Sequence, residues 1–211
     1  MDTIVALATP SGRSAIGVIR LSGAKAMAIT RALVGDDQFS PPSSRVVLKS
    51  IRDPFTREVV DRALITCFKA PDSFTGDDLV ELSCHGSPII LRRLIDLILK
   101  LDGRLAGPGE FTLRALSNGK LNLSQAEAIR DLINSQTDAA AKQAVRQLSG
   151  ELSKRVQPFK DQLVRLIVQL ESALEFVEDD LPAVQAKQIN QDMLELIADV
   201  AAMAATFAAG H

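Results

Sequence analysis

Tryptophan and tyrosine are absent from the 211 residues, and cysteine and histidine occur only twice each. Cys67 and Cys84 both lie in apolar stretches, which indicates reduced, buried thiols of a cytoplasmic protein. With His85 and His211 as the only histidines, no plausible four-ligand zinc set can be assembled. We therefore expect no metal site in this chain.

Long apolar runs and an excess of one charge are absent too. No window reaches the roughly 18 apolar residues that a membrane span needs, and residues 1–20 lack the basic stretch and apolar run of a secretory signal. The net charge of −2, with acids and bases interspersed, predicts neither a strongly basic nucleic-acid surface nor an acidic tail. The 46% of hydrophobic residues is enough for the core of one large or two small domains.

The first half of the chain has a mixed pattern. Short segments rich in β-branched residues predict strands at residues 2–9, 15–21, 62–68 and 78–84, with one more around residues 46–48 after an irregular connection. Two helices are predicted between them. Ser22 is expected to cap the first, which stops at Gly35, and Ser87 with Pro88 to start the second, which Gly103 closes. This order indicates an α+β domain.

The second half has a helical pattern throughout. Ser124 and Glu127 fit a capping box, and the helix that they open is expected to continue to Gly150. Apolar residues spaced by threes and fours then predict helices from residue 152 to 177, despite Pro158, and from residue 189 to 207, with an acidic turn at residues 178–182 between them. Three long antiparallel helices are expected.

Two common kinds of catalytic site are disfavoured. The phosphate-binding string G-x-x-x-x-G-K-[S/T] does not occur, so a nucleotide site within these residues is not expected. Cys84 and His85 are neighbours, but adjacent residues of a strand point to opposite faces. A packed thiol and a hydrogen-bonded histidine are therefore favoured over a catalytic pair.

Three charged residues are candidates for ligand binding. Alternation puts Arg20 on the strand face of Ile16 and Val18, and Glu81 on the face of Leu79, and a charge within an apolar strand needs a partner or a ligand. Lys120 follows the helix-ending Ser-Asn-Gly and precedes a new helix start. The alternatives are that Arg20 and Glu81 pair across neighbouring strands and that Lys120 is a solvated loop lysine.

Three blocks of the sequence carry a family resemblance. DTIVALATPSGRSAIGVIRLSG, DSFTGDDLVELSCHG and GPGEFTLRALSNGKLNLSQAEAIRDLI resemble the signature blocks of the MnmE (TrmE) family of tRNA modification GTPases. The resemblance implies an α+β domain at residues 1–118, with the folate-binding fold of aminomethyltransferases, and part of an all-α long-helix domain at residues 119–211. In this family a G domain is inserted where the present chain ends, so we expect a truncated chain that does not hydrolyse GTP by itself.

The resemblance also implies a cofactor site. Arg20, Glu81 and Lys120 occupy positions whose equivalents in the family bind 5-formyltetrahydrofolate, with Glu81 expected at the pterin edge and the two basic residues at the tail or formyl oxygen. No catalytic residue is expected in this part of the protein. The chain departs from the family pattern at Gly107, where arginine is usual, and at Ser87, where a second glycine is usual.

The implied function belongs to the full-length protein. Members of the family work as homodimers with the flavoprotein MnmG, in a heterotetramer, to add an aminomethyl or carboxymethylaminomethyl group at C5 of the wobble uridine of tRNA in the cytoplasm. GTP hydrolysis there depends on potassium and magnesium. Two alternatives stay open: a stand-alone folate-dependent aminomethyltransferase, and a non-catalytic dimerisation scaffold whose charged residues pair internally.

Overall fold

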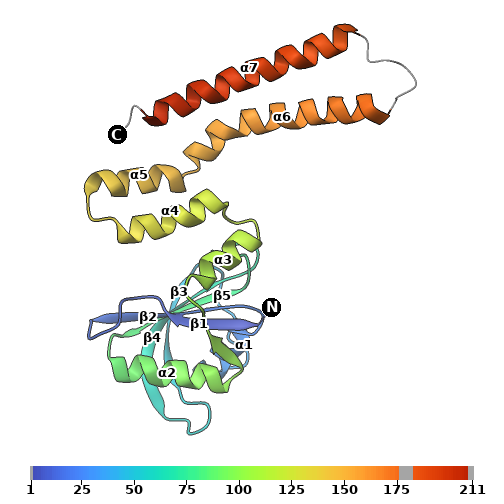
Figure 1. Ribbon diagram of the computed structural model, residues 1–211. Coiled ribbons are helices and arrows are strands. Elements are labelled where there is room, and N and C mark those ends of the chain that lie inside the picture. Colours follow the sequence, from blue (N-terminus) through green and yellow to red (C-terminus); the bar gives the residue numbers. More distant parts are fainter. Residues whose placement is uncertain (1, 176–182, 209–211) are drawn as a thin grey trace. The chain divides into compact units, whose positions relative to one another are not determined.

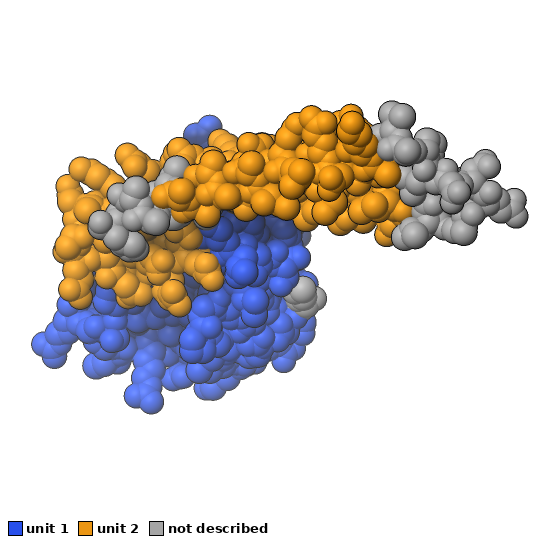
Figure 2. All heavy atoms as spheres, turned by 45° about the horizontal axis from the view of Figure 1, so that its top comes forward, with its two compact units in different colours: residues 1–126 blue, residues 127–211 orange. Residues whose placement is uncertain are grey.

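The computed structural model describes residues 2–175 and 183–208, so the turn predicted at residues 178–182 lies outside the described residues. The chain forms two compact units, unit 1 at residues 1–126 and unit 2 at residues 127–211 (Figure 2). Unit 1 combines a sheet with helices, and the described part of unit 2 is helical (Figure 1). The predicted order of an α+β part followed by a helical part is confirmed. The predicted domain boundary at residue 118 stays a prediction.

Unit 1 contains a six-stranded sheet of order β3-β4-β5-β2-β1-β6. Neighbouring strands are antiparallel, except for the parallel pair β1 and β6. The sequence predicted all of these strands but β6, whose three residues are too few to show alternation. Their bounds are β1 Thr3–Leu7, β2 Ile16–Ser22, β3 Val46–Arg52, β4 Val59–Phe68, β5 Leu79–His85 and β6 Gly103–Leu105.

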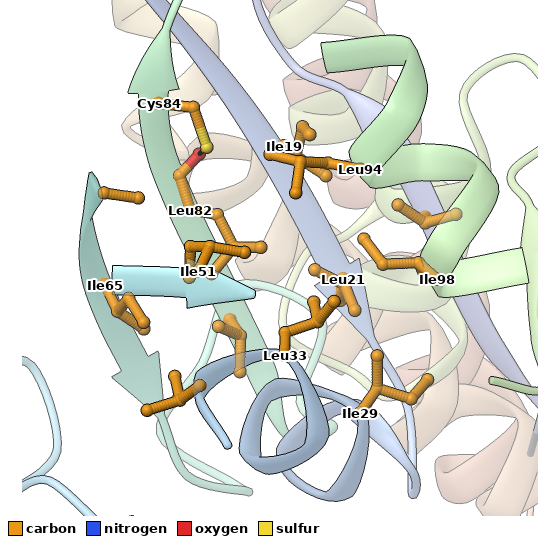
Figure 3. Close-up of a cluster of buried hydrophobic side chains, with 14 of the residues drawn as sticks. Ile19, Leu21, Ile29, Leu33, Ile51, Ile65, Leu82, Cys84, Leu94 and Ile98 are labelled. Atoms are coloured by element: carbon orange, nitrogen blue, oxygen red, sulfur yellow. Dashed lines mark hydrogen bonds between the residues drawn. The ribbon is translucent and has the colours of Figure 1, made fainter. Parts of the chain in front are cut away.

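One face of the sheet forms the core of unit 1 with two helices, α1 (Ala26–Val34) and α2 (Pro88–Lys100). Figure 3 shows side chains of the sheet and of both helices pointing toward one another. Ile19, Leu21 and Leu82 from the central strands are fully buried there, together with Leu33 of α1 and Leu94 of α2. A third helix, α3 (Glu110–Ser117), follows β6.

The ends of α1 and α2 correct two predictions. Ser22 does not cap α1: it belongs to β2, and α1 begins at Ala26 after Lys25. Gly35 ends α1 in the left-handed conformation (φ 70°), as predicted. Ser87 and Pro88 occupy the N-cap and first positions of α2 as expected, although the Ser87 side chain makes no capping bond. Gly103 does not close α2, because it belongs to β6 and α2 ends at Lys100.

The other face of the sheet carries Arg20. Its neighbours Ile19 and Leu21 point into the core, so Arg20 shares the opposite face with Ile16 and Val18, as alternation predicted. Toward the β3 edge this second face exposes apolar side chains. Val46, Leu48 and Leu64 are 61%, 52% and 46% exposed, and Ile16, at the start of β2, is 58% exposed.

Four helices follow Lys120 in the described residues, where the sequence predicted three. The helix expected to reach Gly150 is broken into α4 (Leu123–Asn134) and α5 (Asp138–Leu148), because Thr137 caps α5 by accepting a hydrogen bond from the Ala140 N–H. The reciprocal capping bonds at the start of α4 join Asn122 and Gln125. The box predicted at Ser124 and Glu127 is therefore wrong, since the same bonds form two residues earlier.

The remaining helices, α6 (Glu151–Glu175) and α7 (Ala183–Ala208), run side by side in opposite directions (Figure 1). Pro158 lies inside α6. Leu166 of α6 and Ile189 of α7 are buried, but Leu163, Val164, Ile167, Met193, Leu194 and Ile197 are all more than 40% exposed. None of the helices in the described ranges is both long and apolar enough to cross a membrane.

Candidate functional site

Arg20 and Glu81 form an ion pair on the open face of the sheet. They lie directly opposite each other in the register of β2 and β5. Glu81 Oε1 accepts hydrogen bonds from Arg20 Nε at 2.9 Å and from Arg20 Nη2 at 2.6 Å. The two side chains are 30% and 26% exposed. The alternative that they pair across neighbouring strands is therefore observed, although solvent still reaches the pair.

Two phenylalanine rings flank the guanidinium of Arg20. Phe74 lies in the connection between β4 and β5, at residues 69–78, and Phe111 lies in the first turn of α3. The guanidinium carbon is 5.6 Å from the ring centre of Phe74 and 5.8 Å from that of Phe111, within the range of a cation–π contact. We call Arg20, Glu81, Phe74 and Phe111 the Arg20 cluster.

The Arg20 cluster leaves hydrogen-bonding capacity unused. Both bonds from Arg20 reach Oε1 of Glu81, and within the described part of the chain no hydrogen bond reaches Oε2. An ionised carboxylate can accept about four hydrogen bonds through its two oxygens. A ligand with N–H groups can therefore bind Glu81 without displacing Arg20.

Lys120 lies next to the connection that carries Phe74. The Cγ atom of Lys120 would be 3.3 Å from a Cβ built on Gly76. The side chain is exposed, and the ion pairs found among the described residues do not include its ammonium. The structure thus brings two of the three predicted residues into contact and places the third beside the neighbouring segment.

The buried Arg114 and its charged partners hold α3 against the sheet. The side chain of Arg114, 7% exposed, donates to the Asp2 carbonyl oxygen at 2.8 Å and to Asp2 Oδ1 at 2.6 Å. Glu110 binds Arg104, the Gly107 N–H and Arg114. The hydrogen bonds from Arg104, first of all, lower the pKa of Glu110 to about 2. These contacts fix α3, and with it Phe111.

The sequence reasoning missed Phe74, Phe111 and Arg114. Both phenylalanines belong to the blocks that carry the family resemblance, and the chain contains only eight phenylalanines. Their place within these blocks was the available signal. Nothing in the pattern distinguishes Arg114 from an exposed helix arginine, since its burial depends on contacts with Asp2, more than a hundred residues away.

Cys84 and His85 do not form a catalytic pair. Cys84 is buried in the core, where burial first of all raises the pKa of its thiol to about 12. His85 points away from it, with Nδ1 2.6 Å from Oδ1 of Asp61. Burial would raise the pKa of Asp61, but hydrogen bonds from His85 and the Arg62 N–H outweigh it and lower that pKa. The packed thiol and hydrogen-bonded histidine are confirmed.

The described residues offer no cluster of three or more histidine, cysteine or acidic side chains that could hold a metal ion. The groups of the Arg20 cluster can form ion pairs, hydrogen bonds and aromatic contacts. Such a set of groups is suited to binding a flat, polar and partly anionic molecule.

Two protein families match the chain. The family described as GTP-binding protein TrmE N-terminus matches residues 3–120, and the family described as MnmE helical domain matches residues 123–211. The first match contains the whole Arg20 cluster and Lys120, and together the two matches cover nearly the whole chain.

Several curated proteins are similar to this chain over nearly its whole length. The tRNA modification GTPase MnmE of Koribacter versatilis is 43% identical over 99% of this chain and 46% of its own length. The proteins of that name from Thermus thermophilus and Aquifex aeolicus are 41% and 42% identical over 92% and 90% of this chain, and 45% and 42% of their own lengths. The chain thus spans less than half the length of these relatives. The two matched families show that the chain belongs to the MnmE family, also called TrmE.

Proposed function

We propose that this chain binds a reduced folate, 5-formyltetrahydrofolate, with the Arg20 cluster and Lys120. The observation that carries the proposal is the state of the Arg20–Glu81 pair. It is partly exposed, it uses one carboxylate oxygen of Glu81, and aromatic rings flank its guanidinium. In the described residues the second oxygen of Glu81 accepts no hydrogen bond, so it is available to N–H groups of a ligand.

The chemistry of a folate fits these groups. The aminopyrimidine edge of the pterin presents parallel N–H donors, and Oε2 of Glu81, which accepts no hydrogen bond from Arg20, can accept from them. The glutamate tail of the folate is anionic and suits the exposed ammonium of Lys120, while Arg20 can bind the formyl oxygen or the tail. The flat pterin ring can pack against Phe74 or Phe111, as aromatic side chains do with other planar groups.

The activity of the whole protein is proposed from the family. Relatives about twice as long as this chain are named tRNA modification GTPases. We propose that the whole protein hydrolyses GTP, with potassium and magnesium, and modifies C5 of the wobble uridine of tRNA in the cytoplasm with the flavoprotein MnmG. Within it, this chain holds the one-carbon donor. The chain contains no glycine-rich phosphate loop, so it should not hydrolyse GTP by itself.

We further propose that unit 1 forms a homodimer. The exposed apolar residues Val46, Leu48 and Leu64 on the open face of the sheet support this, because large exposed apolar patches mark interaction surfaces. They lie on β3 and β4, and β3 is an edge strand. An apolar edge of this kind needs a partner or a cover.

Calorimetric titration with 5-formyltetrahydrofolate tests the folate site. Changing Glu81→Gln or Lys120→Gln should weaken binding roughly ten- to a hundredfold, which corresponds to the loss of one charged hydrogen bond of about 1.5–3 kcal/mol. Glu58→Gln and Lys25→Gln are matched controls, because both residues form ion pairs elsewhere in unit 1, with Arg93 and Asp102. They should leave the affinity within about twofold of the wild type.

The same titration separates the alternatives. If the wild type gives no heat and no shift in ligand absorbance, the charged residues serve the fold and the protein is a scaffold. If binding persists unchanged in Glu81→Gln, the folate binds elsewhere. A stand-alone aminomethyltransferase would bind folate equally well, but it would transfer the aminomethyl group without GTP, which the GTPase relatives do not favour.

A further inference from the structure

We infer that Asn118 is a positioning residue, which sets where Lys120 lies relative to the Arg20 cluster. The inference rests on the proposed folate site. It concerns the contact between two segments of unit 1, residues 73–77 with Phe74 and residues 118–120 with Lys120. Neither Asn118 nor its partner Thr75 was singled out by the sequence.

A hydrogen bond of Asn118 joins the two segments. Asn118 Nδ2 donates to the carbonyl oxygen of Thr75 at 2.7 Å. Thr75 is completely buried, and its hydroxyl lies 2.6 Å from the hydroxyl of Ser22. Ser22 follows Arg20 by two residues on β2. Thr75 therefore connects the strand of Arg20, the segment of Phe74 and, through Asn118, the turn of Lys120.

Gly76 lets the two segments approach closely. Its φ of +80° lies in the left-handed region, which favours glycine. A Cβ at this position would be 3.0 Å from Cβ of Asn118 and 3.3 Å from Cγ of Lys120. The turn thus packs directly on the backbone at Gly76, and there is little space for it to move inward.

Backbone hydrogen bonds at the C-terminal end of α3 fix the backbone of Lys120 relative to Asn118. The Gly119 N–H donates to the Leu116 carbonyl oxygen at 3.1 Å, and the Lys120 N–H donates to the Ala115 carbonyl oxygen at 2.8 Å. With Gly119 at φ +67°, these bonds form a Schellman motif. The motif fixes the backbone of Lys120 relative to Asn118. A bond that holds the Asn118 side chain therefore also limits where the Lys120 side chain starts.

Holding the backbone of Lys120 in place should strengthen ligand binding, because the lysine side chain is long and flexible. Its flexible stem gives the ammonium many positions, and ordering a long side chain on binding costs affinity. A fixed starting point reduces that cost for an anionic group held over the Arg20 cluster. Removing the Asn118 bond should therefore weaken folate binding only as far as Lys120 contributes to it.

A double-mutant cycle measures this dependence. The four proteins are the wild type, Asn118→Ala, Lys120→Gln and the double variant, each titrated with 5-formyltetrahydrofolate in the calorimeter. Asn118→Ala should weaken binding roughly three- to tenfold in the wild type, and less than about twofold when Lys120 is already changed. Asn134→Ala is the control, because Asn134 ends α4 and is exposed. It should leave the affinity unchanged.

The outcomes are distinguishable. If the wild type does not bind, the proposed function fails and this inference with it. If the wild type binds but Asn118→Ala has no effect, or the same effect in both backgrounds, Asn118 does not act through Lys120 and the inference is overturned. Should Asn118→Ala fold poorly by circular dichroism, Asn118→Ser, which keeps a polar side chain too short to reach Thr75, takes its place in the cycle.

Discussion

Glu110 begins α3 and binds two arginines, so its protonation is expected to destabilise unit 1. Arg104, the Gly107 N–H and Arg114 lower its pKa from 4.5 to about 2, and its side chain is 16% exposed. A carboxylate with a lowered pKa stabilises the folded state above its unfolded pKa, and this contribution disappears as the pH falls through the folded pKa. The window therefore runs from about pH 4.5 down to about pH 2.

The size of the effect follows from the same contacts. Full conversion of the shift would give about 3.4 kcal/mol at roughly 1.36 kcal/mol for each pKa unit. Arg104 is 47% exposed, so solvent screens much of that interaction. We expect Glu110→Gln to lower the free energy of unfolding of unit 1 by about 1–2 kcal/mol near pH 7, and most of the difference from the wild type to vanish as the pH falls to about 2.

Thiol exposure in urea provides the assay. Both cysteines are buried in unit 1, so their labelling by dithiodipyridine, which also reacts with thiols in acid, reports on the opening of this unit alone. Rates are divided by those of the fully unfolded protein at each pH. Glu58→Gln, which changes an exposed carboxylate on another ion pair, is the control. Equal labelling rates of the wild type and Glu110→Gln near pH 7 would refute the reasoning. So would a difference in rate that stays the same in acid.

Two further predictions concern the core and the open face of unit 1. Burial raises the pKa of Cys67 to about 11 and that of Cys84 to about 12, so neither thiol should react with iodoacetamide near pH 8 in the folded protein, and both should react in urea. Mass spectrometry reads the modification, and alkylation of the folded protein would contradict the burial. Leu48→Glu or Leu64→Glu should weaken self-association in analytical ultracentrifugation, because a charge is then buried in the proposed dimer interface. An unchanged sedimentation profile would place the interface elsewhere.

The strands of unit 1 could be predicted because their patterns are local. Runs such as those of β2 and β5 combine β-branched residues with clear alternation, which fixes the face of Arg20 and of Glu81. Their direct contact could not be derived in the same way. The two residues are 61 positions apart, and they meet because β5 pairs with β2 after two intervening strands. Register between distant strands depends on the packing of the whole sheet.

Helix starts were harder to predict because several capping patterns compete. Asn122 with Gln125 and Ser124 with Glu127 both fit a capping box, and they overlap. The earlier one forms, since α4 follows closely on the turn at Gly119. Thr137 followed by an aspartate was a visible start signal for α5. It was overlooked because the apolar pattern alone did not show the break.

The Arg114 network and the Arg20–Glu81 pair differ in how many of their hydrogen-bonding groups have partners within the protein. In the Arg114 network, the buried guanidinium binds a backbone carbonyl and carboxylates, and the Glu110 carboxylate uses both of its oxygens. Glu81 uses one oxygen, and its pair is open to solvent. The same unit thus contains one charged network whose partners are all within the protein and one that still has capacity for a ligand. The folate that we propose would supply a partner for the oxygen of Glu81 that Arg20 does not use.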